Sequence, residues 1–255
     1  MRDPAESDEY ADFFDPHEYL RQYYSLPQLA QDDARLFQSL TAWLKQQDRM
    51  FATALDLGCG PTIHNTFAIA PYVQHLDLAD YLPANLAEIR HWLDDAPDAH
   101  NWDPLFRGVL QCQGVDANQL PARKALFRAR IGKLRHCDLH WGEPLGEPMQ
   151  YDLVTSFFCV ECVADSTEQW QSFMSRLLGL VRPGGAIFLA AVRNAERYRV
   201  LGRWFRTVPI NEYDLKQIMI EHGFSPPLIH AQAVPAPDWA DDGFDHICLV
   251  SATRH

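Results

Sequence analysis

The stretch Asp56-Leu57-Gly58-Cys59-Gly60-Pro61-Thr62-Ile63 decides how this chain folds. A short apolar strand, Thr53–Leu57, is predicted to run directly into it, and a helical stretch follows. Gly58 and Gly60 allow the backbone to turn sharply at the end of a strand and to approach a ligand closely. Taken alone, the same turn is equally compatible with a purely structural connection between a strand and a helix.

A second predicted strand, from about His75 to Ala79, ends in an acidic residue. Asp80 follows Gly58 by 22 residues, where a carboxylate can accept hydrogen bonds from both hydroxyls of a ribose. Asp138, in a later predicted strand at His136–Leu139, can accept a hydrogen bond from an adenine amino group. Because the carboxyl ends of parallel strands meet at one edge of a sheet, this spacing predicts a nucleoside pocket.

The residues after the turn indicate which nucleoside ligand fits. A dinucleotide fingerprint needs glycine where this chain has Ile63, which disfavours a nicotinamide-dependent oxidoreductase. A pyrophosphate favours a helix N-terminus without side chains, whereas Pro61 and Thr62 follow the glycines at once. A hydroxyl at this point suits a carboxylate better. Adenosine joined to an amino acid is S-adenosylmethionine (SAM), so we expect a Rossmann-like class I methyltransferase fold.

The rest of the chain continues to alternate strands and helices. Further strands are predicted at Tyr151–Phe157, Ala186–Val192, Leu228–Val234 and His246–Ala252. Helices are predicted at Asn85–Leu93, Glu168–Val181 and Leu215–His222. This alternation predicts an α/β fold with a doubly wound, mostly parallel sheet of seven strands. We interpret the basic runs within 123–135 and 193–206 as solvated helix faces.

Apolar residues recur at helical spacing from Phe13 to Leu44 and predict two or three helices ahead of the sheet. We therefore assign residues 1–50 to an N-terminal helical segment, in which residues 1–12 are expected to fray. Residues 51–255 are assigned to the SAM-binding domain, and the whole chain is expected to form one structural domain.

The composition narrows the possible partners. The 255 residues include 22 basic and 34 acidic ones, which gives a net charge of −12 and disfavours both nucleic acid and anionic lipid. Apolar residues make up 47%, which excludes disorder and fibrous structure. No apolar run approaches the roughly 18 residues that span a bilayer, and the acidic N-terminus lacks the features of a secretory signal. We expect a cytoplasmic monomer with no membrane partner.

Six cysteines in a chain of this length do not indicate a disulfide framework. Cys159 and Cys162 form an isolated C-x-x-C, and no second pair lies at the spacing of a zinc site. We interpret them as packed thiols rather than as a metal or redox site, and no metal is predicted.

Ordered motifs run through residues 13–253. They are Phe14-Asp15-Pro16, Tyr19–Tyr24, Asp56–Ile63, Asp80-Tyr81, Asn85-Leu86, Cys137–Leu139, Ser156–Glu161, Leu180–Gly185 and Val208-Pro209. The chain closely resembles the nicotinamide, phenylethanolamine and indolethylamine N-methyltransferase family. The resemblance implies a SAM-dependent methyltransferase whose N-terminal helices cover the cofactor.

The resemblance also implies a set of cofactor-binding residues: Tyr19, Tyr24, Gly58, Gly60, Thr62, His64, Asp80, Tyr81, Asn85, Asp138, Leu139 and Cys159. Tyr19 and Tyr24 would lie near the methionine end, where aromatic faces and hydroxyls suit a sulfonium. Thr62 would bind the carboxylate. Relatives carry tyrosine where this chain has His64, which either hydrogen-bonds the cofactor carboxylate or is a surface histidine.

Acceptor-side residues are implied in the same way: Phe14, Tyr23, Phe157, Arg193, Tyr198 and Asp241. Tyr23 could instead be a core aromatic residue, and Asp241 a solvated loop acid. Phe157 replaces a small residue of the relatives and narrows the space near the methyl group. The acidic side chain that amine-methylating relatives place after the Ala186–Val192 strand is absent, and Arg193 could pair with an anionic group of the substrate.

Glu161 is the candidate catalytic residue. A nitrogen nucleophile needs an unprotonated lone pair, so a nearby group must accept its proton. Glu161 follows the predicted strand Tyr151–Phe157 and matches an acidic substrate-side position of the family; the alternative is an N-cap or a surface acid. We predict in-line methyl transfer to an amine or heteroaromatic nitrogen of a small molecule. O- or S-methylation and a non-catalytic SAM-binding partner protein are the alternatives.

Overall fold

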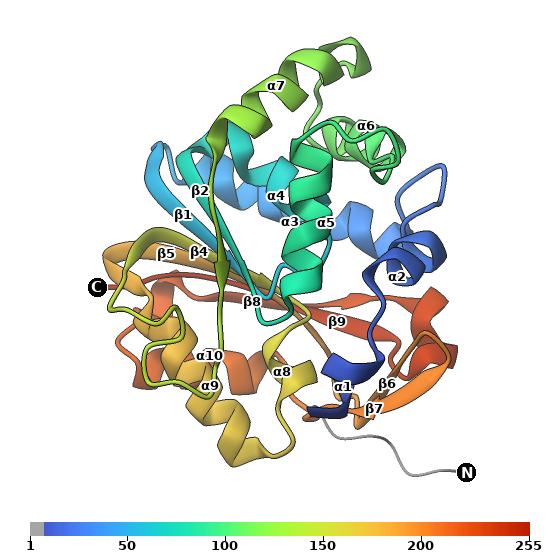
Figure 1. Ribbon diagram of the computed structural model, residues 1–255. Helices are drawn as coiled ribbons and strands as arrows, with labels where there is room; N and C mark the ends of the chain where they lie inside the picture. Colours follow the sequence, from blue (N-terminus) through green and yellow to red (C-terminus); the bar gives the residue numbers. More distant parts are fainter. Residues whose placement is uncertain (1–7) are drawn as a thin grey trace. The chain divides into compact units, whose positions relative to one another are not determined.

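The computed structural model describes residues 8–255 (Figure 1), and these residues form two compact units. One unit comprises residues 8–14 and Cys137–His255, and the other comprises Asp15–His136. Part of the segment expected to fray, residues 1–7, lies outside the described residues. From Asp8 the chain is helical.

The main sheet confirms the expected fold class. Its seven strands have the order β3-β2-β1-β4-β5-β9-β8. The pairs β1–β2, β2–β3 and β4–β5 are parallel, whereas β9 is antiparallel to both β5 and β8. The strands are β1 (Phe51–Leu57), β2 (Val73–Asp80), β3 (Ile131–His136), β4 (Tyr151–Phe157), β5 (Val181–Val192), β8 (His230–Pro235) and β9 (His246–Thr253).

In the Asp15–His136 unit, helices connect β1 to β2 and β2 to β3. The helices are α2 (Pro16–Tyr23), α3 (Gln31–Gln46), α4 (His64–Ile69), α5 (Pro83–Leu93), α6 (Asp103–Cys112) and α7 (Leu120–Arg130), with short 3₁₀ turns η1 (Ala70–Tyr72) and η2 (Ala117–Gln119). The first of these, α2, begins where the sequence dictates, because Asp15 accepts a hydrogen bond from the Glu18 N–H and Pro16 occupies the first turn. Helices α5 and α7 both contact β2.

The other unit holds β4, β5, β8 and β9 together with a two-stranded hairpin. Its remaining elements are α1 (Asp8–Phe13), α8 (Val160–Val163), α9 (Thr167–Gly179), β6 (Arg197–Val200), β7 (Arg203–Arg206), α10 (Glu212–Glu221), η3 (Pro226–Leu228) and η4 (Pro237–Asp242). Helix α10 begins at a capping box in which Asn211 and Asp214 bond each other's backbone N–H groups. Helix α9 packs on β5, and α10 packs on β8 and β9.

The helix expected within 193–206 is wrong, because this segment forms the β6–β7 hairpin. Arg199 pairs with Trp204 across the hairpin, and Val200 pairs with Arg203. Leu201 and Gly202 connect the strands with φ values of 50° and 77°, the backbone of a tight hairpin turn. Arg197, Arg199 and Arg206 therefore share one face of a ribbon, and Arg203 lies on the other, so no helix face joins them.

The strand expected at His136–Leu139 lies earlier in the chain, at β3 (Ile131–His136). Its charged residues are compatible with a strand because Asp77 of β2 binds them. The Asp77 carboxylate accepts a hydrogen bond from the Lys133 N–H at 2.7 Å and pairs with the Arg135 guanidinium at 2.9 Å. Asp138 consequently follows the strand and is not part of it.

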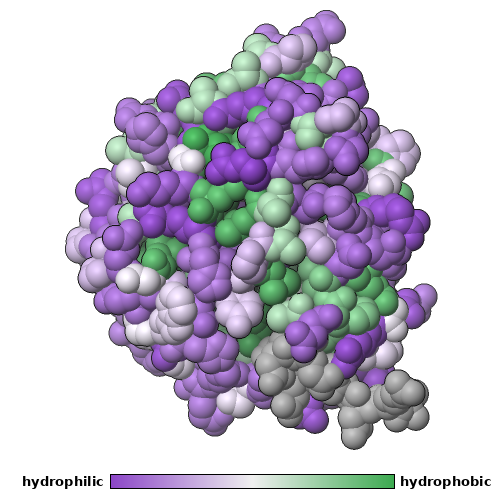
Figure 2. Space-filling model, viewed as in Figure 1, coloured by the Kyte–Doolittle hydropathy of each residue, from purple (hydrophilic) through white to green (hydrophobic). Residues whose placement is uncertain are grey.

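Hydrophilic residues cover most of the face drawn in Figure 2, with apolar residues visible between them. None of the helices in residues 8–255 is both long enough and apolar enough to cross a membrane. The large aliphatic and aromatic side chains are mostly buried, for example Phe37, Phe67 and Phe106. They serve mainly to build the packed interior.

Candidate functional site

The turn after β1 has the backbone that its glycines predict. Gly58 and Gly60 have φ values of 72° and 59°, in the left-handed region that glycine adopts without strain. The N–H groups of Gly58 and Cys59 both donate to the Ala79 carbonyl, at 2.8 and 3.1 Å, which fixes the turn against β2. A Cβ atom added at Gly60 would have nothing within 4 Å, so open space lies beside its Cα atom.

Asp80 is the last residue of β2, and its carboxylate binds the turn that follows β1. One carboxylate oxygen accepts the Gly60 N–H at 2.7 Å, and the other accepts the Leu82 N–H and the Asn85 side-chain amide, both at 2.9 Å. The side chain is only 7% exposed, and burial raises its pKa, although the three hydrogen bonds act in the opposite direction. Asp80 is therefore a rigid hydrogen-bond acceptor at the edge of the sheet.

Among the described residues of the Asp15–His136 unit, several buried polar atoms have no hydrogen-bond partner. They include Oδ1 of Asn85 and Nδ1 of His64, which both lie in elements that follow β1 and β2. Buried polar atoms are normally satisfied, so orphaned ones indicate that a further polar group binds there. Together with the open space beside Gly60, they fit a polar ligand that carries both hydroxyl and carboxylate groups, as SAM does.

His64 is not the surface histidine that one interpretation allowed, because it is 2% exposed and surrounded by aromatic rings. Its ring stacks on Trp102 at 5.4 Å and lies 5.0 Å from the Tyr24 ring and 5.7 Å from the Phe37 ring. Burial, with a smaller contribution from His100, lowers its pKa to about 3. His64 is therefore neutral at physiological pH and can donate one hydrogen bond but carries no charge.

The other predicted site residues of this unit are the tyrosines in and just after α2, Thr62 and Tyr81. The Tyr19 and Tyr24 hydroxyls are 3.4 Å apart, and the Tyr23 ring packs 5.1 Å from the Tyr19 ring. The Thr62 hydroxyl donates to the Cys59 carbonyl at 2.9 Å, so in this rotamer it offers a ligand only its acceptor lone pairs. Tyr81 is 52% exposed, with its ring 5.5 Å from the His136 ring.

Glu161, in the other unit, is neither an N-cap nor a surface acid. It lies in the short helix α8, whose N-cap is Cys159, and it is 2% exposed. One carboxylate oxygen accepts the N–H of Val192 at 2.9 Å. Burial raises the pKa of Glu161 to about 7, against the smaller opposing effects of the Val192 N–H and the Cys162 thiol. The carboxyl group is thus poised to exchange a proton near neutral pH.

An apolar cluster lies next to Glu161 in the chain and shares Val192 with it. Cys162, Val192 and Ala195 form this buried cluster, and Phe158, Tyr198 and Phe244 pack against it. Phe157, 7% exposed, lies at the end of β4, and Phe14 is 9% exposed. The structure thus places Tyr198 against the cluster that contains Val192, whose backbone N–H binds the Glu161 carboxyl group.

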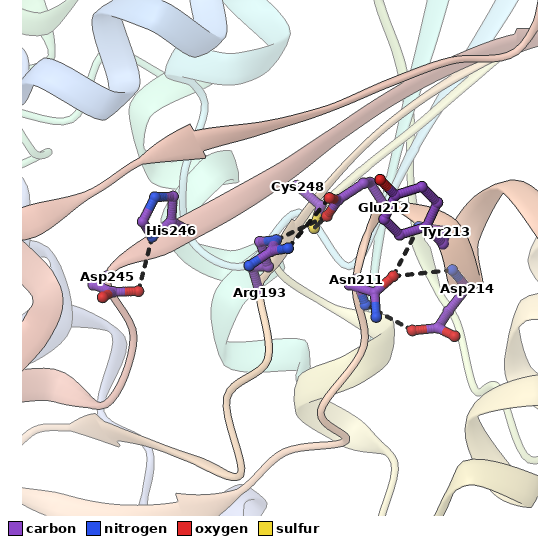
Figure 3. A network of polar contacts seen from close by, with 8 residues as sticks. All are labelled: Arg193, Asn211, Glu212, Tyr213, Asp214, Asp245, His246 and Cys248. Atoms are coloured by element: carbon purple, nitrogen blue, oxygen red, sulfur yellow. Dashed lines mark hydrogen bonds and ion pairs between the residues drawn. The ribbon is translucent and has the colours of Figure 1, made fainter.

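Other predicted residues of this unit have different surroundings. The Arg193 guanidinium donates two hydrogen bonds to the Glu212 carboxylate, from Nε at 2.8 Å and from a terminal nitrogen at 3.2 Å (Figure 3). Asp241 is exposed in η4. The Asp138 carboxylate accepts the His140 N–H at 2.8 Å. Leu139 is buried.

The cysteines of the C-x-x-C pair are free thiols, with Cys162 buried and Cys159 half-buried. Burial raises the pKa of the Cys162 thiol well above its ordinary value, and the negative charges of Glu161 and Cys159 act in the same direction. A thiol that resists ionisation is a poor nucleophile and metal ligand, which agrees with the interpretation of packed thiols. Residues 8–255 contain no group of three or more metal-binding side chains.

Sequence reasoning missed three contributors to these arrangements. Trp102 stacks on His64, although no motif connects them. Val192 and Thr207 hold Glu161, Val192 through its backbone N–H and Thr207 through a hydroxyl that donates to the Glu161 carbonyl at 2.9 Å. Val192 is the last residue of β5, which pairs with β4, the strand before Glu161; this position is the one signal that could have found it.

Comparison with known proteins now identifies the class. The model of the NNMT/PNMT/TEMT family matches residues 3–253, and the chain belongs to this family. Phenylethanolamine N-methyltransferase of Bos taurus is 26% identical over 253 residues, covering 94% of this chain and 87% of the relative. Indolethylamine N-methyltransferase of Oryctolagus cuniculus is 25% identical over 226 residues, covering 85% of this chain and 84% of the relative.

A solved structure agrees at the level of the fold. Magnesium protoporphyrin IX methyltransferase from Synechocystis PCC 6803, with bound S-adenosylhomocysteine, superposes with a TM-score of 0.60 at 14% identity and covers 98% of both chains. The resemblance inferred from the motifs is therefore confirmed. The protein is a methyltransferase that uses SAM.

Proposed function

We propose that this methyltransferase acts on a nitrogen atom of a small, flat acceptor and that Glu161 accepts the proton which the nitrogen loses. The observation that carries the proposal is the burial of Glu161 with a pKa raised to about 7. A general base is most effective when its pKa lies near the working pH. The names of the two relatives, both N-methyltransferases, support nitrogen as the accepting atom.

Methyl transfer to an N–H nitrogen requires one group that accepts the proton. When bound, SAM supplies a methyl group on a positively charged sulfur. The nitrogen lone pair would form the new bond to the methyl carbon as the carbon–sulfur bond breaks, and that electron pair would stay on sulfur, so that S-adenosylhomocysteine leaves. An acceptor nitrogen that carries an N–H would then pass its proton to the Glu161 carboxylate. Phe158, Tyr198 and Phe244 line the neighbourhood with flat, apolar surfaces that favour an aromatic or heteroaromatic acceptor and exclude water.

Residues of the Asp15–His136 unit would hold the cofactor. Oδ2 of Asp80 accepts only the Gly60 N–H and keeps a lone pair that can accept a ribose hydroxyl, and the orphaned Asn85 Oδ1 can accept one further donor. His64 would donate to the cofactor carboxylate if Nδ1 carries its proton. Tyr19 and Tyr24 would lie at the methionine end, and residues 1–50 would act as the lid.

Several finer expectations belong to the proposal. We propose that Tyr81 lies beside the adenine and that Asp138, Leu139 and Cys159 belong to the cofactor side. On the acceptor side we retain Phe14, Tyr23, Phe157 and Asp241. Arg193 is reassigned below, because its guanidinium pairs with Glu212. The acidic composition supports a cytoplasmic location and the absence of nucleic-acid and membrane partners; a monomer remains our expectation.

The test is a panel of acceptors offered together with SAM that carries an isotope label on the methyl group. The panel contains aromatic amines, heteroaromatic nitrogens, phenols and thiols, and mass spectrometry locates the label in each product. We expect label on nitrogen, and loss of transfer in Glu161→Gln with SAM binding retained in calorimetry. Glu168→Gln, an exposed glutamate in the first turn of α9, is the matched control. Transfer to thiols or phenols alone would overturn the proposal.

A further inference from the structure

Glu161 is held at two points by two different segments. Its backbone carbonyl accepts the Val208 N–H at 3.0 Å and the Thr207 hydroxyl at 2.9 Å. Its side-chain Oε1 accepts the Val192 N–H, at the end of β5. The orientation of the carboxyl group therefore depends on how the end of β5 is placed relative to segment 207–212.

Two contacts fix this placement directly. The N–H of Asn194 donates to the Ile210 carbonyl at 2.8 Å. The Arg193 guanidinium binds the Glu212 carboxylate through Nε at 2.8 Å and through a terminal nitrogen at 3.2 Å, as Figure 3 shows. Two parallel hydrogen bonds of this kind fix both distance and orientation, which a single contact does not.

The contacts close a ring. Starting from the Glu161 carbonyl, the ring passes through Val208 and along the chain to Glu212, crosses to Arg193, and returns through the Val192 N–H to the Glu161 carboxylate. We infer that the Arg193–Glu212 ion pair positions the Glu161 carboxyl group for proton transfer; this rests on the proposed role of Glu161. Arg193 and Glu212 are positioning residues and touch no reacting atom.

The contacts of the Arg193–Glu212 ion pair with other residues support its role in holding these segments together. Glu212 is 14% exposed and also accepts the Cys248 thiol at 3.6 Å, and Arg193 is 28% exposed. The Arg193 hydrogen bond is the largest influence on Glu212 and lowers its pKa, so the carboxylate is charged at neutral pH. The Arg193 N–H donates to the His246 carbonyl at 3.0 Å, which joins the ring to β9. An acceptor's anionic group could reach this guanidinium only through the N–H donors that Glu212 does not use.

The test measures the pKa of Glu161 and needs no acceptor. The full chain is labelled with ¹³C at the glutamate side-chain carboxyl carbons, and its NMR spectrum is followed from pH 5 to 9. Glu161→Gln identifies the resonance by its disappearance. Arg193→Gln and Glu212→Gln each break the ring, the exchange Arg193→Glu with Glu212→Arg restores a pair, and Arg182→Gln removes the Asp152 ion pair at the opposite end of β5 as a control.

We expect both ring-breaking variants to raise the pKa of Glu161 by ~1 unit, because the carboxylate loses part of its bond from Val192. The exchange variant should return the pKa toward the wild-type value, and Arg182→Gln should leave it unchanged. A purely electrostatic influence would give opposite signs, since Glu212→Gln leaves a positive charge that lowers the pKa and Arg193→Gln leaves a negative charge that raises it. Opposite signs, no shift, or an equal shift in Arg182→Gln would each overturn the inference.

Failure of this inference is distinguishable from failure of the proposed function. If Glu161→Gln abolishes methyl transfer but the ring-breaking variants leave the pKa of Glu161 unchanged, Glu161 is the base and the ion pair does not position it. If Glu161→Gln transfers methyl at the wild-type rate, the proposed function fails, whatever the titration shows. Thermal unfolding and SAM calorimetry on each variant verify that the chain is folded.

Discussion

Each of the two units contains a buried carboxyl group, Asp80 in one and Glu161 in the other, and their surroundings differ in one decisive respect. Asp80 accepts three N–H donors, from Gly60, Leu82 and Asn85, which together use both of its oxygens. The Glu161 side chain accepts the Val192 N–H, its own backbone N–H and the Cys162 thiol, which is a weak donor. Burial raises the pKa of both carboxyl groups against these hydrogen bonds, and it raises that of Glu161 to about 7.

The comparison teaches that the strength of the hydrogen-bond donors, and not burial alone, separates a carboxylate that binds a ligand from one that accepts a proton. A carboxylate with three strong N–H donors stays charged and fixed, so it can receive a hydroxyl group of a ligand. A buried carboxylate with weaker donors exchanges its proton near neutral pH. The predictions below test this distinction, from the largest expected effect to the smallest.

The largest effect is expected for methyl transfer in Glu161→Gln. Glutamine keeps the size of the side chain but cannot accept the proton, so kcat should fall by about 10²- to 10⁴-fold, the usual contribution of a general base. The dissociation constant of SAM should remain unchanged. Stopped assays with labelled SAM measure the rate, and Glu168→Gln should retain full activity. An equal loss in both variants would contradict the assignment.

Because of Glu161, the free energy of unfolding should decrease as the pH rises. Its pKa is about 7 in the folded chain against an ordinary value of 4.5, so between these pH values the unfolded chain releases a proton that the folded chain retains. Relative to Glu161→Gln, the wild type should lose about 3 kcal/mol of unfolding free energy between pH 4 and 8. Urea unfolding at both pH values measures this difference; a constant difference would contradict the raised pKa.

Asp80→Asn should weaken SAM binding by about 10- to 100-fold, because charge-assisted hydrogen bonds to the ribose are worth roughly 1.5–3 kcal/mol. Asp77→Asn is the matched control on the same strand, since Asp77 binds Lys133 and Arg135 of β3. Isothermal titration with S-adenosylhomocysteine measures both variants. Equal weakening in the two would show that the effect comes from the strand and not from the carboxylate at its end.

The smallest effect concerns Gly60. Alanine at a φ of 59° costs about 1–2 kcal/mol in stability. Gly114 has a φ of 70° and, like Gly60, nothing within 4 Å of an added Cβ atom, so Gly114→Ala should cost a similar amount. Only Gly60→Ala should also weaken SAM binding, because its methyl group would occupy the space that a ligand approaches. Equal SAM affinity in the two variants would remove the turn from the binding site.

The first two strands and their polar ends could be predicted from the sequence, because the governing interactions are local. Gly58 and Gly60 adopt a left-handed backbone, and Asp80 ends a short strand that is mostly apolar. The closing strands β8 and β9 were also predicted from short apolar runs. Glu161 could be placed after β4, but its burial and raised pKa depend on residues from other elements.

The hairpin at 197–206 and the partner of Arg193 could not be predicted in this way. Five arginines between residues 193 and 206 fit a helix face as well as a ribbon, and only the Leu201-Gly202 turn distinguishes the two. Glu212 lies 19 residues beyond Arg193 and reaches it because α10 begins beside the end of β5. Such pairings arise from tertiary packing, which spacing along a chain does not encode.

The most direct test of the central claim is the pH dependence of methyl transfer in a single turnover, with enzyme saturated with SAM and an amine acceptor from the panel. The account predicts a rate that rises with pH and has a midpoint near 7 in the wild type, the pKa of Glu161. Glu161→Gln should be slow and lack this midpoint. A wild-type midpoint that persists unchanged in Glu161→Gln would show that another group accepts the proton.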